Sequence, residues 1–364
     1  AFKFKGAVAF GTSFAEDRGN VLVAFSYAKQ DPLNGSKRSF FFDKTPSGFI
    51  GTGTYVPVSS NAPSEAVVTA LFNSYGVAGT RNPVASNLGF NNDGTLFTQT
   101  GALNYRGPNG TGGYAIVGGN VRMPVGQQID YINGLDRKTA FVKADYDLTP
   151  DLSLYGQFMF VDLTTTTHSG GSLTQFPSLT TIPVTNPFIP ADLKALLDSR
   201  TGDDLRIVGA GAAEPFLMRW RTLGAGLRTS DFENTVTQYM GGAKGPIGDK
   251  WSWEAHFSAG RTKITEVQGG NIDTNRLLNT LAAADGGASL CAGGVNPFGR
   301  QPLSADCVSY LTTTSNVNTT FTQRVAQAFV SGDLVQLPAG TLTTVLGGEF
   351  RKFDYTFDPG TASG

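Results

Sequence analysis

Three polar residues that could form a hydrolytic site occupy alternate positions, namely Glu254, His256 and Ser258. A carboxylate, an imidazole and a hydroxyl are the groups of a nucleophilic triad, whose base must lie within hydrogen-bonding distance of the nucleophile. Alternate residues of a strand share a face but lie about 6.6 to 7 Å apart. The spacing therefore favours side chains that line a wet surface, and we expect no enzymatic activity and no catalytic residue.

Two cysteines, Cys291 and Cys307, are the only thiols of the chain, and the region between them contains no histidine. If this region faces the cell exterior, the compartment is oxidising and a disulfide is expected, worth about 3 kcal/mol in the loop-entropy model. Two free thiols and a metal site are the alternatives, the latter disfavoured by the absence of histidine. We expect no bound metal and no cofactor.

Two glycine-rich stretches and one acidic turn could bind phosphate or calcium. Neither the segment 209–215 nor the segment 241–250 has phosphate-loop spacing, because Lys250 is followed by Trp251 instead of serine or threonine. The segment 90–97 contains two asparagines and one aspartate before Gly94. These are too few carboxylates for a calcium loop, so a tight turn is favoured.

Composition restricts the class of protein that can carry these residues. The 364 residues include 46 Gly and 26 Phe, and charged residues make up 16% against about 25% in soluble domains. No apolar run approaches the ~20 residues of a membrane helix, so a membrane protein of this sequence must cross with strands. A net charge of -1 gives no argument for a nucleic-acid partner. The ends at Ala1 and Gly364 suggest a fragment of a longer polypeptide.

The clearest periodicity lies between Gln323 and Arg351, on both sides of the turn 337–340. One row of alternate residues is small and apolar and includes Ala328, Leu346 and Phe350, while the other carries Glu349 and Arg351. Alternation across a short turn predicts a β-hairpin with unlike faces. A face that combines charges with glycines suits a water-filled lumen, and the apolar face suits lipid.

The same pattern recurs along the chain and predicts an all-β fold with eight antiparallel transmembrane strands. Short turns near positions 17, 149, 247 and 339 must lie on one side of the membrane, and three long loops, 31–136, 165–233 and 268–319, on the other. The segment 217–230 is interpreted as an extracellular ribbon or a strand extension, and 190–200 as a short surface helix. The predicted strands are 2–14, 20–30, 137–147, 152–164, 234–244, 251–267, 320–335 and 341–357.

The hairpins assign roles to individual side chains. Trp251, Trp253 and Phe350 lie beside turns or at the end of an apolar row, as an interfacial aromatic girdle requires. Charged or polar residues of the opposite rows should face the lumen, where they line a permeation path or brace an internal plug. These lumen-facing residues are Lys143, Asp145, Glu254, His256, Glu349 and Arg351. The sequence does not identify ligand-binding residues, although the long loops are the best place for them.

Six segments, in order, resemble the middle of the barrel of a TonB-dependent outer-membrane receptor. They are GNVLVAFSYAKQDP at 19–32, FNNDGTLF at 90–97, TNPFIPADLKALLDSR at 185–200, GPIGDKWSWEAHFSAGRT from 245, DGGASLCAGGVNPFG at 285–299 and SGDLVQLPAGTLTTVLGGEFR at 331–351. The resemblance covers most of the chain and matches both cysteines. It implies that the eight strands are part of a barrel of about 22 strands, whose plug domain lies outside this sequence.

The resemblance also implies a function. Such receptors import a scarce nutrient, such as a siderophore, a vitamin or a saccharide, across the Gram-negative outer membrane. Energy reaches the plug from the TonB complex. The expected partners are therefore TonB, outer-membrane lipid and a small ligand of unknown identity. A passive porin-like channel, or a structural or adhesive surface barrel, would share the strands and remains the alternative.

Overall fold

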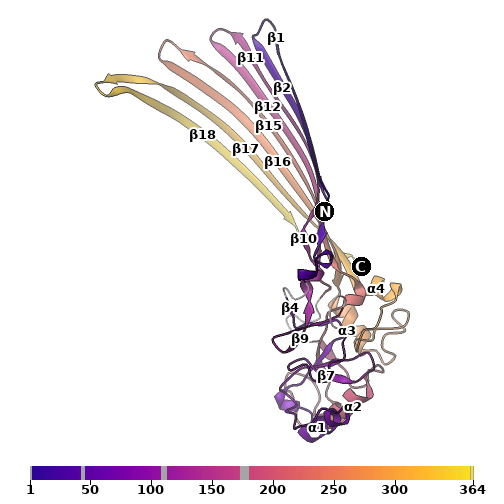
Figure 1. Ribbon diagram of the computed structural model, residues 1–364. Helices are drawn as coiled ribbons and strands as arrows, with labels where there is room; N and C mark the ends of the chain where they lie inside the picture. The colour runs from indigo at the N-terminus through magenta and orange to yellow at the C-terminus, as the bar shows by residue number, and fades with distance from the viewer. Residues whose placement is uncertain (1, 42–45, 108–112, 173–179, 361, 364) are drawn as a thin grey trace.

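A computed structural model describes residues 2–41, 46–107, 113–172, 180–360 and 362–363. Eight long strands run side by side as one curved antiparallel sheet, with a compact loop domain at one end (Figure 1). The predicted all-β fold with eight antiparallel strands is confirmed. In sheet order, the strands are β1 (Lys3–Phe14), β2 (Gly19–Gln30), β11 (Gly134–Thr149), β12 (Leu152–Ser169), β15 (Arg228–Ile247), β16 (Trp251–Ile272), β17 (Thr312–Leu337) and β18 (Gly340–Asp358).

The strands match the predicted ranges closely at the hairpin turns and run further at the loop end. The strand β17, for example, begins at Thr312 instead of position 320, and β15 begins at Arg228 instead of position 234. Near the loop domain both faces of these strands are polar, so the alternation that marks a strand disappears from the sequence. The segment 217–230 contains both predicted features, because Phe216–Arg219 forms the short ribbon β14 and Arg228 starts β15.

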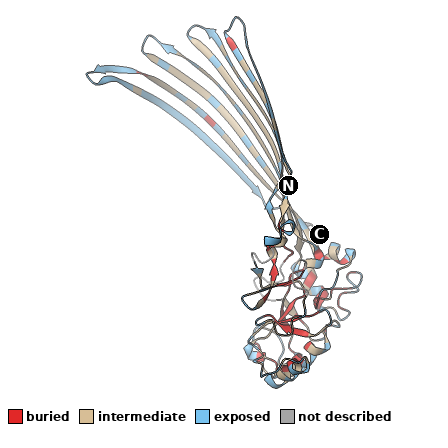
Figure 2. Cartoon of the chain, in the orientation of Figure 1, coloured by how far each residue is buried: buried red, intermediate tan, exposed pale blue. Residues whose placement is uncertain are grey.

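Strand pairing divides the side chains of the sheet between two faces. Residues paired across neighbouring strands share a face, and successive residues alternate. One face, called the apolar face below, carries Phe10, Val23, Val142, Phe158 and Tyr239 in a single cross-strand row. The other, called the polar face, carries the intervening residues. Most side chains of both faces are exposed or half-buried, whereas buried ones concentrate in the loop domain (Figure 2).

The loop domain is built from the three long connections between the hairpins. Its helices are α1 (Glu65–Ser74), α2 (Ala191–Asp198), α3 (Thr274–Ala282) and α4 (Ala305–Leu311). One apolar core joins Phe72 of the first connection to Leu193 of the second and Leu281 of the third. The predicted helix at 190–200 is present as α2, and its three leucines are buried in this core instead of lying on a surface. No helix among the residues described is long and apolar enough to cross a membrane.

Short strands of the loop domain connect the first two connections directly. A five-stranded sheet has the order β13, β14, β5, β6, β7, in which β14 pairs with β5 across 160 or so residues of chain. The strands are β5 (Thr54–Val56), β6 (Leu88–Phe90), β7 (Leu96–Thr98), β13 (Thr180–Ile182) and β14 (Phe216–Arg219). Smaller pairings involve β3 (Leu33–Asn34), β4 (Pro46–Ser47), β8 (Ala115–Val117), β9 (Asn120–Pro124), β10 (Asp130–Ile132) and β19 (Ala362–Ser363).

A disulfide joins Cys291 to Cys307, with the two Cα atoms 4.9 Å apart. Both residues are buried in the loop-domain core, and Cys307 lies in α4. The bond therefore fastens α4 to the segment that precedes it. Of the three states considered from the sequence, the structure has the disulfide.

Replacing both cysteines with serine is expected to lower the free energy of unfolding of the loop domain by about 3 kcal/mol, because the unfolded chain gains loop entropy. Denaturant unfolding, monitored by hydrogen exchange of loop-domain peptides, measures this loss. A reductant should produce the same loss in the wild type and none in the double variant. Unfolding of the wild type that ignores reductant would contradict the prediction.

Candidate functional site

A cavity of about 600 Å³ opens where the three connections of the loop domain meet. The first connection contributes Tyr114 and the second Trp220, while Arg300 comes from the third. The residues that line the cavity are Ser36, Gly51, Gly113, Tyr114, Met123, Pro124, Gln127, Gln128, Trp220, Leu223, Gly224, Arg300, Gln301 and Pro302. A wall made of aromatic rings, amides and one guanidinium, with no carboxylate in that list, suits a neutral or anionic small molecule.

Tyr114 and Arg300 lie beside each other in the wall, and Arg300 supplies its charge. The Tyr114 side chain is buried, and its hydroxyl oxygen accepts a hydrogen bond of 2.8 Å from the backbone N–H of Thr52. Burial raises the pKa of Tyr114, so the phenol is neutral at physiological pH. The Arg300 guanidinium carbon lies 5.1 Å from the centre of the Tyr114 ring, a cation–π distance. Arg300 itself is exposed, so its charge remains available to a ligand.

Trp220 and Arg221 anchor the second connection against the first. The Trp220 indole Nε1 donates to the carbonyl of Gly51 at 3.0 Å, which fixes the ring in the cavity wall. Behind it, the Arg221 guanidinium donates to the carbonyls of Phe49 and Gly171 at 3.2 and 3.0 Å. Burial, and then the nearby charge of Arg228, lowers the pKa of Arg221 to about 10. Arg221 thus acts as a brace that holds the wall by hydrogen bonds.

A second hollow of about 250 Å³ shares Arg300 and Gln301 with the first. One side of this hollow is the turn that contains Asn91 and Gly94. Arg300 therefore lies between two hollows and can contact a ligand in either.

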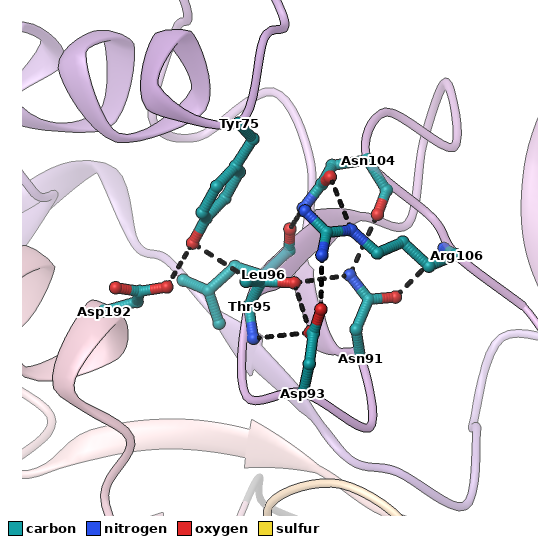
Figure 3. A network of polar contacts seen from close by, with 8 residues as sticks. All are labelled: Tyr75, Asn91, Asp93, Thr95, Leu96, Asn104, Arg106 and Asp192. Atoms are coloured by element: carbon teal, nitrogen blue, oxygen red, sulfur yellow. Dashed lines mark hydrogen bonds and ion pairs between the residues drawn. The ribbon is translucent and has the colours of Figure 1, made fainter.

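The turn beside the second hollow is held by its own side chains (Figure 3). Asp93 accepts from the hydroxyl and backbone N–H of Thr95 at 2.6 and 3.1 Å, and it forms an ion pair with Arg106. The hydrogen bond from Thr95 is the main cause that lowers the pKa of Asp93. This carboxylate is already satisfied within the turn, as the turn interpretation of 90–97 requires. Among the residues that the structure describes, no group of three or more potential ligands could hold a metal.

A half-buried tyrosine, Tyr75, links the helices beside this turn (Figure 3). The Tyr75 hydroxyl bonds to the Asp192 carboxylate of α2 and accepts from the backbone N–H of Leu96 at 3.2 Å. Burial first, and then the bond to Asp192, raises the pKa of Tyr75. This contact joins the C-terminal end of α1 to α2 and β7.

All six predicted lumen-facing residues lie on the polar face of the main sheet, by the strand pairing. Glu254 accepts from the Tyr155 hydroxyl at 2.5 Å, and Glu349 pairs with Arg351 at 2.9 Å. His256 Nδ1 has no hydrogen-bond partner in the described part of the chain, and the hydrogen bond of Glu254 is to Tyr155 instead of His256. The three groups of the hypothetical triad are therefore not connected. Lys143 and Asp145 share the polar face nearby.

The three predicted girdle residues lie on the apolar face. Trp251 is paired with Gly332, and a side chain at Gly332 would meet the Trp251 ring at 2.4 Å. The indole therefore covers the glycine of the next strand. Trp253 lies two residues further along the same face, and Phe350 is 68% exposed on β18. Their membrane role stays a prediction.

The sequence did not indicate Tyr114, Trp220 or Arg300 as parts of one site. These residues are more than a hundred positions apart from the first to the second, and none belongs to a periodic pattern. A usable signal was the aromatic and basic segment around Trp220, which interrupts a loop otherwise rich in small residues.

No protein-family model and no curated protein sequence matches the chain. A search of solved structures finds the ferric-catecholate import receptor Fiu from E. coli K12 in its open form, at 10% identity and a TM-score of 0.27. The match covers 97% of this chain and 44% of that chain, so the chain spans less than half of that structure. A score of this size does not establish a shared fold.

Proposed function

We propose that the main sheet is part of an outer-membrane barrel and that the loop domain captures a nutrient for TonB-driven import. The observation that carries the membrane assignment is a band of uncharged residues on the apolar face, which is at least nine residues long in β2, β11, β12, β16 and β18. It spans Gly19–Tyr27 in β2, Trp251–Ala259 in β16 and Leu342–Phe350 in β18. A tilted transmembrane strand needs about 9 to 11 residues. Charged side chains follow on the same face.

The band also crosses the strands obliquely. A cross-strand row of the apolar face leads from Val23 in β2 to Lys352 in β18. In β18 this row already contains the first charged residue, whereas β2 reaches its first charge only at Lys29, six residues further on. Six residues correspond to about 20 Å, and six strand spacings to about 29 Å. In a flat layer, these strands would therefore be tilted by roughly 35° from the layer normal, within the tilt of membrane barrels.

The ends of the sheet require further strands or further copies of the chain. Among the strands described, β1 pairs only with β2, and β18 only with β17. Unpaired backbone groups are not tolerated in hydrocarbon. We therefore expect the sheet to close into a larger barrel, of about 22 strands if the family resemblance holds.

Three features support active import over the porin and adhesin alternatives. The loop domain has its own core and disulfide instead of open loops, it contains a cavity of ligand size, and the six segments resemble TonB-dependent receptors in order. In this proposal the ligand binds among Tyr114, Trp220 and Arg300, and an energised plug admits it along the polar face. The protein performs no covalent chemistry.

Uptake measurements in cells that carry the full-length protein test this proposal. The probes are labelled ferric siderophores, cobalamin and oligosaccharides, each in cells with and without TonB. Saturable uptake of one probe that disappears without TonB is the expected result. Uptake that persists and rises linearly with concentration would replace the proposal with a passive channel. Surface attachment without uptake of any probe would favour the adhesive barrel.

Two single substitutions test whether the cavity binds the ligand. Removing the cation in Arg300→Gln, or the aromatic ring in Trp220→Leu, is expected to weaken binding of the transported probe about tenfold, since a charged hydrogen bond or a ring contact is lost. Equilibrium binding to the purified protein measures the effect. Arg38→Gln, which removes an exposed arginine of the first connection that does not line the cavity, is the control. Equal affinities of all variants would rule out this cavity as the capture site.

A further inference from the structure

Four cations gather on the apolar face just beyond the uncharged band, and they are called the cationic patch. They are Arg261 and Lys263 of β16, Arg324 of β17 and Lys352 of β18. All four are exposed. Arg324 is paired directly with Lys352 on the neighbouring strand. Arg261 is paired with Thr322, which is the neighbour of Arg324 on the same face of β17, towards the loop domain.

Only one of the four cations in the cationic patch has an acidic partner among the residues described. Among the residues described, no carboxylate bonds to Arg324, Arg261 or Lys263, and the one ion pair joins Lys352 to Asp354 at 3.4 Å. Like charges directly opposite each other destabilise a sheet. An anion between Arg324 and Lys352 would remove that repulsion.

On two other strands of the same face, the first lysine beyond the uncharged band is paired with an acidic residue. Lys138 of β11 is paired with Asp162 of β12, and Lys29 of β2 with Asp136 of β11. At that end of the sheet each lysine is opposite a carboxylate. The excess of positive charge is therefore confined to the last three strands, and it is not a general property of this boundary.

We infer that the cationic patch binds the phosphate groups of a lipid head group in the outer leaflet. This inference depends on the proposed membrane position of the sheet. The patch lies beyond the end of the band on the side of the loop domain, at the depth of head groups, and the guanidinium groups match phosphate geometry. Directly below, Phe350 and Phe257 are 68% and 53% exposed and offer apolar surface to acyl chains. A phosphorylated lipid satisfies both requirements, whereas free phosphate satisfies one.

Native mass spectrometry of the detergent-solubilised full chain, titrated with lipid A, tests the inference. Wild-type protein should bind lipid A more tightly than the same lipid with its phosphates removed, and inorganic phosphate should not compete at equal concentration. The Arg324→Gln/Lys352→Gln variant should bind lipid A roughly thirtyfold more weakly, because each basic residue near a membrane surface contributes about fivefold. The Arg324→Lys/Lys352→Arg variant should restore binding.

A matched control removes two charges from the same face. Lys29→Gln/Lys138→Gln loses cations that already face carboxylates, so its affinity for lipid A should equal that of the wild type. Equal binding by the patch variant would overturn the inference, and competition by inorganic phosphate would show a simple anion site instead. Flotation of the protein with lipid vesicles distinguishes failure of the lipid-binding inference from failure of the proposed membrane function. If the wild type floats and the patch variant binds normally, only the patch inference is wrong, whereas failure of the wild type to float overturns both.

Discussion

Arginine in place of Ala255 is expected to destabilise the membrane-inserted protein by about 2 to 4 kcal/mol, the cost of an arginine at the bilayer midplane of a barrel. Ala255 is the central residue of the uncharged band in β16, on the apolar face. Urea titration of the protein folded into lipid vesicles measures the free energy of unfolding.

The control for this experiment is Ser258→Arg, three residues along the same strand. Ser258 lies on the polar face, where its neighbours Met240 and Val325 share the side that we assign to the lumen. Water there can solvate the new charge, so we expect a change within about 1 kcal/mol. If both arginines destabilise the protein equally, the two faces do not have different solvents and the barrel assignment is wrong.

Alanine in place of Phe72 is expected to lower the stability of the loop domain by about 3 to 5 kcal/mol, because the substitution leaves a cavity in a packed core. Phe72 is 0% exposed and belongs to the cluster that joins all three connections. Hydrogen exchange resolved by peptide should show the loss throughout α1, α2 and α3.

The matched control is Phe40→Ala, the same deletion at a site that is 63% exposed. It should change loop-domain stability by less than about 1 kcal/mol. A loss restricted to α1 in the Phe72 variant would mean that the three connections fold independently, contrary to the shared core.

The sheet could be predicted because its chemistry is local and periodic. In a strand such as β16, the apolar residues from Trp251 to Ala259 alternate with polar residues, which gives the strand two unlike faces. Beyond Arg261 the alternation stops. The strand nevertheless continues to Ile272, so the sequence pattern could not show where it ends. Short turns were located well because they interrupt the pattern sharply.

The loop domain and its cavity could not be predicted in the same way. Its core joins residues that are far apart in sequence, as in the ring contact between Phe90 and Phe298, with centroids 5.2 Å apart. Only the helix α2 left a clear local signal. The spacing of Val67, Val68, Leu71 and Phe72 in α1 was a second helical signal that the turn-rich composition of the region concealed. The partners of such apolar residues depend on the hairpins that bring the connections together.

That dependence sets an order of assembly. The first connection leaves β2 at Gln30 and returns in β11, where Gln30 is paired with Leu135, so both ends of about a hundred residues are held at neighbouring-strand distance. Closing a free loop of that length costs about 4 kcal/mol of chain entropy. Pairing of the strands offsets this cost before any contact in the loop domain forms. We therefore expect the hairpins to assemble first and the loop domain to acquire protease resistance last, as a slow phase of folding.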